Sequence, residues 1–124
     1  MAITTPTLVE HVPVGAVLFV ATGSGRSDGL IELKAAVTGK SIYVTRLLVS
    51  TLDVLGDTYA SLYDGIALVT VFGPVALQID GSGTFEKQWK YPLKLSSGSP
   101  LGAYSKTSGG DGKDTGFYVE GYVA

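Results

Sequence analysis

The chain has 124 residues, a net charge of −2 and no cysteine, and charged residues make up only 16% of it. This length fits one domain, the slight negative charge gives no electrostatic footprint for nucleic acid, and the lack of cysteine excludes disulfides and thiolate metal sites. No apolar run approaches the roughly 20 residues of a membrane span, and the low charge density together with 17 glycines favours self-association.

Residues 1–13 are predicted to form an extended N-terminal arm, because Pro6 and Pro13 bias the residues before them toward extended backbone. Three apolar side chains are spaced along it: Ile3, Leu8 and Val9. We expect the arm to dock on a partner, since such side chains are unusual in a tail that stays in water. A frayed terminus is the alternative.

Two strands are predicted next, at residues 14–22 and 29–36, joined by the glycine-rich turn GSGRSDG. In the second strand the apolar and charged residues alternate, which is the pattern of a strand with one buried face. The turn is partly similar to a dinucleotide-binding loop. A strand follows it where that loop requires a helix, so no nucleotide site is expected.

Residues 39–52, GKSIYVTRLLVSTL, are rich in β-branched side chains and are predicted to form the central strand. Its apolar residues change parity partway, from Ile42 and Val44 to Leu47 and Val49. Either both faces of this strand are covered, or a β-bulge near Thr45 and Arg46 shifts the register.

Turn residues divide the rest of the chain into short strands. The turn signals are the stretch from Asp53 to Asp57 and the stretch from Asp80 to Gly83. The Gly73-Pro74 dipeptide marks a turn or an edge, because Pro74 cannot donate a hydrogen bond to a neighbouring strand. Strands are expected at residues 58–63, 66–72, 75–79, 85–91, 101–105 and 115–123, with a flexible tip at 106–114.

These short strands predict an all-β fold, a jelly-roll β-sandwich of about eight antiparallel strands at residues 14–124. An immunoglobulin-like sandwich is the alternative, although the chain has no Cys–Trp–Cys pattern. No helix of three turns is predicted.

No stretch of the sequence predicts catalysis. His11 is the only histidine, so a catalytic triad would have to be built on the arm, and a multi-histidine metal site is impossible. Glu86 and Glu120 are candidates for a pair of glycosidase carboxylates, but both lie on the polar parity of their strands. The aspartates of the turns lack the spacing of a calcium loop. We therefore expect no enzyme activity, no metal and no cofactor.

Two aromatic groups are candidates for stacking on a sugar: Trp89 with Lys90 and Tyr91, and Tyr118 with Tyr122. Core packing or contact between subunits is the more common use of such side chains.

Four segments follow one another in the order GKSIYVTRLLVS, YASLYDG, GPVALQIDGSGTFEKQWKYPLKLSSGSPL and TGFYVEGYV. In their turns and strand parities, these segments from Gly39 to Val123 resemble the small jelly-roll capsid decoration (cement) proteins of tailed bacteriophages. The resemblance implies a homotrimer that binds the major capsid protein. It includes no catalytic signature, so no functional residue is transferred from that family.

The sequence thus predicts a virion structural protein that binds the outer capsid surface as a trimer and stabilises the shell. A carbohydrate-binding or adhesin module of a phage tail or fibre is the alternative, and a non-catalytic domain of a cellular β-sandwich protein is a third. No nucleic acid and no membrane are expected as partners. The residues expected to bind a partner are Ile3, Leu8, Val9, Tyr118 and Tyr122.

Overall fold

The structure, a computed structural model, describes residues 12–25, 29–65, 69–107 and 115–124. They form six antiparallel strands: β1 (Val17–Gly25), β2 (Gly29–Lys34), β3 (Ile42–Asp64), β4 (Val69–Lys94), β5 (Leu101–Thr107) and β6 (Thr115–Val123). This part of the chain contains no helix long and apolar enough to cross a membrane.

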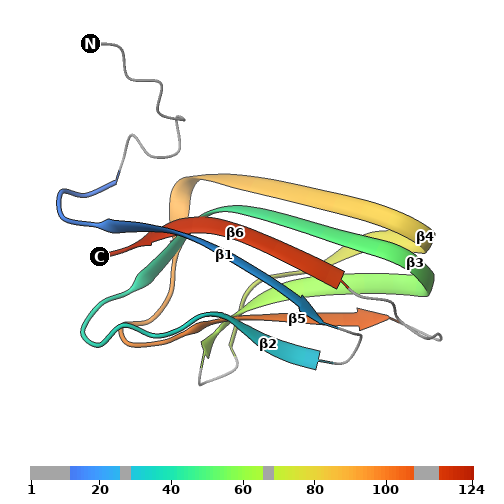
Figure 1. The fold of residues 1–124 in the computed structure, drawn as a ribbon, viewed down its shortest axis with the longest axis horizontal. Helices are drawn as coiled ribbons and strands as arrows, with labels where there is room; N and C mark the ends of the chain where they lie inside the picture. The colour runs from blue at the N-terminus through green and yellow to red at the C-terminus, as the bar shows by residue number, and fades with distance from the viewer. Residues whose placement is uncertain (1–11, 26–28, 66–68, 108–114) are drawn as a thin grey trace, which may run out of the picture.

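The strands form two layers, because β3 and β4 are long enough to belong to both. Residues 42–51 of β3 pair with β6, residues 58–64 pair with β5, and β4 pairs with β3 along both halves. One layer therefore has the order β1-β6-β3-β4 and the other has the order β2-β5-β3-β4. In Figure 1, β1 and β6 lie above β5 and β2.

Counting each half of β3 and β4 as a separate strand gives eight strands in two antiparallel sheets. In chain order, the first, eighth, third and sixth strands form one sheet, and the second, seventh, fourth and fifth form the other. This is the strand order of a jelly roll, so the predicted fold class is confirmed.

Of the two alternatives for the parity change in the central strand, the structure has the β-bulge, at the expected place. The register of β3 against both β4 and β6 shifts between Val44 and Arg46. Val44 and Thr45 are therefore both buried, and the Thr45 hydroxyl donates a hydrogen bond to the Glu120 carbonyl oxygen at 3.0 Å. Beyond the bulge Leu47 points into the core.

Two predicted turns are wrong, because residues 53–57 lie inside β3 and residues 80–83 lie inside β4. Gly73-Pro74, which was expected at a turn or an edge, lies inside β4, and among the described strands β4 pairs only with β3 and so forms an edge of both layers. The register between β3 and β4 shifts repeatedly in this region. A long hairpin that passes from one layer to the other has to bend, so residues with turn preferences serve here as bends and bulges within continuous strands.

The first strand begins later than predicted, because residues 13–16 form a turn. The Ala16 amide donates to the Pro13 carbonyl oxygen at 3.1 Å, and Gly15 has a φ of 87°. Glycine adopts this backbone conformation without the steric cost of a Cβ. The chain therefore reverses direction immediately before β1.

The core lies between the two layers. β6 follows its predicted bounds and turns Phe117, Val119 and Val123 inward, as expected. The other large apolar side chains that are fully buried are Ile42, Val44, Leu47, Val49, Leu62, Leu95 and Leu101. Burying each of them contributes about 1.5–3 kcal/mol before conformational entropy is subtracted, so this interior accounts for most of the cohesion of the fold.

A buried carboxylate fastens the end of β3 to the loop after β4. Asp64 Oδ2 accepts hydrogen bonds from the Ser96 amide at 2.8 Å and from the Ser96 hydroxyl at 2.7 Å. Burial alone raises the pKa of Asp64, but these hydrogen bonds outweigh it and the pKa lies below its ordinary value.

Most of the predicted arm lies outside the described residues, and so does most of the predicted tip at 106–114. The structure therefore does not place Ile3, Leu8, Val9 or His11.

Candidate functional site

The outer face of the β1-β6-β3-β4 layer contains the two tyrosines predicted to bind a partner. Because β6 alternates, the residues between its core positions point to this outer face. We call six residues of this face the tyrosine face: Tyr118, Glu120 and Tyr122 of β6, and their register partners Leu48, Arg46 and Tyr43 of β3.

A charged cluster lies in the middle of the tyrosine face. Arg46 Nε donates to Glu86 Oε2 at 2.8 Å, and Arg46 Nη1 donates to Glu120 Oε2 at 3.2 Å. The Tyr118 hydroxyl donates to the same Glu120 oxygen at 2.8 Å, and the Arg46 guanidinium carbon lies 5.9 Å from the centre of the Tyr118 ring. Tyr118 is thus held at both its hydroxyl and its ring.

The two glutamates raise the pKa values of Tyr118 and Arg46 in this cluster. The hydrogen bond to Glu120 raises the pKa of Tyr118, because losing the proton would break that bond and place two anions together. The hydrogen bond to Glu86 is the main cause that raises the pKa of Arg46, whose burial opposes it. At neutral pH these raised pKa values keep Arg46 charged and Tyr118 protonated.

The second predicted tyrosine is covered. Tyr122 is only 4% exposed, and its ring stacks on Tyr43 with the centroids 4.7 Å apart and the planes 13° from parallel. Burial, and secondarily Tyr43, raises the pKa of Tyr122. Lys94 Nζ lies 5.8 Å from the centre of the Tyr43 ring. Tyr122 therefore supports the ring of Tyr43, which is the more exposed of the two.

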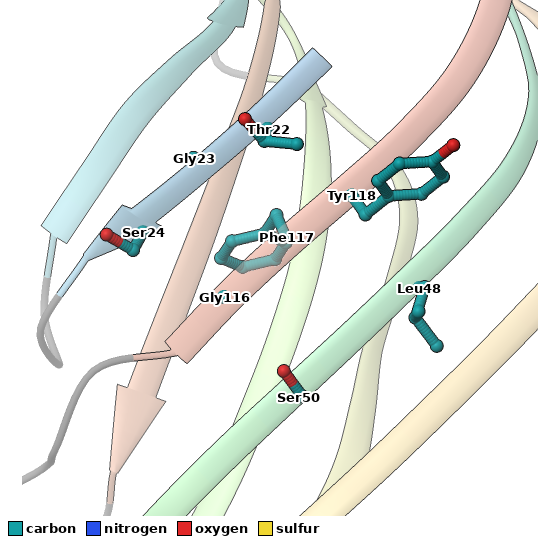
Figure 2. A pocket seen from close by; sticks show the side chains of 8 residues that line it. All are labelled: Thr22, Gly23, Ser24, Leu48, Ser50, Gly116, Phe117 and Tyr118. Carbon is teal, nitrogen blue, oxygen red and sulfur yellow. The ribbon is translucent and has the colours of Figure 1, made fainter. Parts of the chain in front are cut away.

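A shallow hollow of about 380 Å³ adjoins Tyr118 (Figure 2). Its lining consists of Thr22, Gly23 and Ser24 of β1, Leu48 and Ser50 of β3, and Gly116, Phe117 and Tyr118 of β6. Hydroxyl-bearing residues and the two aromatic residues, Phe117 and Tyr118, make up most of this lining, and none of its residues is charged. The hollow is therefore suited to a neutral polar group and is unsuited to a metal ion.

The tyrosine face continues onto β1, which ends this layer. On β1, Leu18 is 58% exposed and Val20 is 61% exposed, although both are large apolar residues. They lie opposite Tyr122 and Glu120 in the register of β1 with β6. The face is therefore an apolar and aromatic surface around a small charged centre.

The other candidate groups do not form sites. Trp89 packs edge-on against Phe72, with the ring centres 5.0 Å apart, at the border of the core, whereas Tyr91 is exposed. They do not form a common platform. Glu86 and Glu120 share Arg46 on an open face rather than facing each other across a cleft. Among the described residues, no group of three His, Asp or Glu side chains is placed to hold a metal ion.

The sequence predicted Tyr118 from strand parity but missed Arg46 and Tyr43. Tyr43 faces outward by simple alternation between the buried Ile42 and Val44, whereas Arg46 becomes an outward-facing neighbour of β6 only when the bulge between Val44 and Arg46 is located. The parity change in the sequence was the available signal. It left open whether a bulge or two-sided burial was responsible.

No protein-family model matches the chain, and no curated protein matches it. Among solved structures it is similar to the tobacco streak virus coat protein, with 12% identity, a TM-score of 0.46, and 89% of this chain and 86% of that one covered. It is also similar to a structure of infectious bursal disease virus, Gt strain, with 17% identity, a TM-score of 0.42 and coverage of 89% and 32%. A third similarity is to Bacillus endospore appendages that form disulfide-linked pili, with 13% identity, a TM-score of 0.40 and coverage of 84% and 88%.

The chain spans about one third of the length of the infectious bursal disease virus chain. At these identities and TM-scores, the three similarities do not indicate what this chain binds.

Proposed function

We propose that this chain is a virion structural protein, a capsid decoration protein that binds the outer capsid surface as a homotrimer and stabilises the shell. The resemblance of residues 39–123 to the decoration proteins of tailed bacteriophages supports this proposal, and the jelly-roll strand order agrees with it. In this role the protein has no catalytic activity and binds no cofactor.

The observation that carries the proposal is the composition of the tyrosine face and the neighbouring part of β1. Leu18 and Val20 are largely exposed beside Tyr118, whose ring is already fixed by Glu120 and Arg46. An exposed apolar surface with fixed aromatic side chains loses little side-chain entropy on binding, and tyrosine and arginine are enriched in protein interfaces. This surface is suited to contact with another protein.

The trimer adds avidity to such a contact. Three modest contacts that one rigid trimer makes together on a shell raise the effective affinity well above that of a single contact. We assign the contacts with the partner to Tyr118 and to Ile3, Leu8 and Val9 of the arm. Tyr122 contributes indirectly, because it supports the ring of Tyr43.

Light scattering after size-exclusion chromatography tests the oligomeric state. The expected mass at micromolar concentration is three times the 12.9 kDa of one chain. A mass of 12.9 kDa at every concentration excludes the trimer.

Co-sedimentation with undecorated phage capsids tests the role of the tyrosine face. We expect Tyr118→Ser to weaken capsid binding at least tenfold, whereas Tyr59→Ser, on the other layer, leaves it unchanged. Equal binding by the two variants and the unmodified protein excludes the tyrosine face as the capsid contact.

The alternative function, a carbohydrate-binding or adhesin module, is favoured by the hollow beside Tyr118. An aromatic ring next to the hydroxyls of Thr22, Ser24 and Ser50 has the character of a saccharide subsite. A glycan array separates the two functions. Saturable glycan binding that Tyr118→Ser abolishes, without binding to capsids, supports the alternative and contradicts the decoration role.

A further inference from the structure

The strand β1 has an open edge that lacks the usual protection. Among the described strands it pairs only with β6, and that pairing has no bulge. Its nine residues, VLFVATGSG, include no charge and no proline. Natural proteins normally protect such an edge with lysine, proline, a bulge or a covering segment, because an exposed edge pairs with other strands. β1 contains no lysine, no proline and no bulge, so a covering segment is the remaining way to protect its edge.

The chain just before β1 is positioned to provide that segment. The turn at residues 13–16 reverses the chain direction, as the bend ahead of β1 in Figure 1 shows. β6 occupies one side of β1, with Val123 opposite Val17. A chain that runs back from the turn therefore meets the open side. Residues 4–12 would span about 30 Å in extended form, which matches the nine residues of β1.

We propose that residues 4–12 form an additional antiparallel strand on the open edge of β1 in the same chain. The Pro13–Ala16 turn sets the register, because pairing continues outward from its hydrogen-bonded ends. Val9 then lies opposite Val20, and Leu8 lies opposite Ala21.

This register places the side chains of the arm on suitable faces. Leu8 shares the inner face with the buried Ala21, and Val9 joins the exposed Val20 on the outer face. A slip of one residue would exchange these two faces and point Leu8 outward.

Charge supports the same register. Glu10 lies opposite Phe19, and the ammonium group of Lys34 lies 5.4 Å from the centre of the Phe19 ring. Lys34 forms no ion pair with another described residue. The proposed strand brings the Glu10 carboxylate next to the Lys34 ammonium group, where β1 and β2 face each other.

Proline placement agrees as well. With Pro13 and Ala16 hydrogen-bonded, the odd-numbered residues of the arm bond to β1, and the even-numbered residues point their amides away. Pro6, which has no amide hydrogen, falls on an outward position. At this position Pro6 removes no hydrogen bond between the arm and β1. It also protects the outer edge of the proposed strand from pairing with a further strand.

The inference does not depend on the proposed function, but it refines the role of the arm. Val9 extends the row of Val20, Glu120 and Arg46, and so belongs to the partner-binding surface. Leu8 lies on the inner face in this register, so the proposed strand replaces the partner contact assigned to Leu8 above by a role in stabilising the fold.

Engineered disulfides test the proposal in the full chain, because the natural sequence has no cysteine. The test variant combines Val9→Cys with Val20→Cys, which the proposed register places within bridging distance. Two control variants combine Val9→Cys with Leu18→Cys or with Thr22→Cys, two residues out of register on the same face. Free-thiol counts and non-reducing electrophoresis follow the oxidation.

We expect the Val9–Val20 pair to close within one chain at least tenfold faster than either control pair. Equal rates for the three pairs, or a covalent dimer as the main product, would overturn the proposal. The dimer would show that the arm lies on a neighbouring copy. In the same variant, E10K should slow closure about two- to fivefold and K34E should restore it, the range expected for an exposed ion pair. No effect of E10K contradicts the assigned register.

Discussion

Replacing Gly121 of β6 by alanine tests how closely β6 approaches the bulge of β3. A Cβ at this position collides with the Tyr43 carbonyl oxygen and lies 3.0 Å from the Phe19 ring. The ring can move, but the carbonyl belongs to the backbone of the neighbouring strand. Either β6 has to separate from β3, or the bulge between Val44 and Arg46 has to rearrange.

The expected cost is at least that of overpacking a core, about 1–3 kcal/mol of unfolding free energy. Gly116→Ala is the matched control, because it lies in the same strand and also faces β3. A Cβ there meets only the Ser50 hydroxyl at 3.5 Å, an ordinary contact. Since alanine has less backbone entropy to lose than glycine, we expect Gly116→Ala to be neutral or to stabilise by up to about 1 kcal/mol.

Urea unfolding followed by tryptophan fluorescence measures both variants, because the chain has one tryptophan, Trp89, which packs at the border of the core. The midpoint should fall for Gly121→Ala and should not fall for Gly116→Ala. Equal midpoints for the two variants would refute the close approach of β6 to the bulge.

Three further predictions concern the carboxylate clamp, metal ions and the arm. Asp64→Ala should lower the unfolding free energy by about 1–3 kcal/mol at pH 7, because it removes hydrogen bonds to a charged group. Since the folded-state pKa of Asp64 lies below the ordinary 3.8, this contribution is complete above that pH and is lost as the pH falls through the folded-state pKa. Urea titrations from pH 7 to pH 3 check this, and a difference that grows in acid contradicts it. Calcium or EDTA should leave the melting temperature unchanged, and a shift of several degrees in a thermal melt would reveal a bound ion. Deleting residues 1–12 should leave a β-rich circular dichroism spectrum but weaken the trimer or capsid binding, and unchanged light scattering and co-sedimentation would show that the arm is only a frayed terminus.

Local patterns alone predicted several elements correctly. Alternation from Phe117 to Val123 indicated a strand with one buried face, and β6 has the predicted bounds and inner face. The parity change after Val44 left a bulge near Thr45 and two-sided burial as alternatives, and the structure has the bulge. These features could be predicted because the side chains of a strand alternate between its two faces. A strand with one buried face therefore has an apolar residue at every second position.

Tertiary structure decided where the strands end and which side chains meet. Residues 53–57 and the Gly73-Pro74 dipeptide have the composition of turns, yet they lie within β3 and β4, because pairing along the whole hairpin compensates for poor local strand preference. The charged cluster was equally invisible in the sequence, since Arg46 lies 40 residues from Glu86 and 74 residues from Glu120. Only the register of β3 against both of its neighbours brings the three side chains together, and that register depends on the pairing of distant strands rather than on any local pattern.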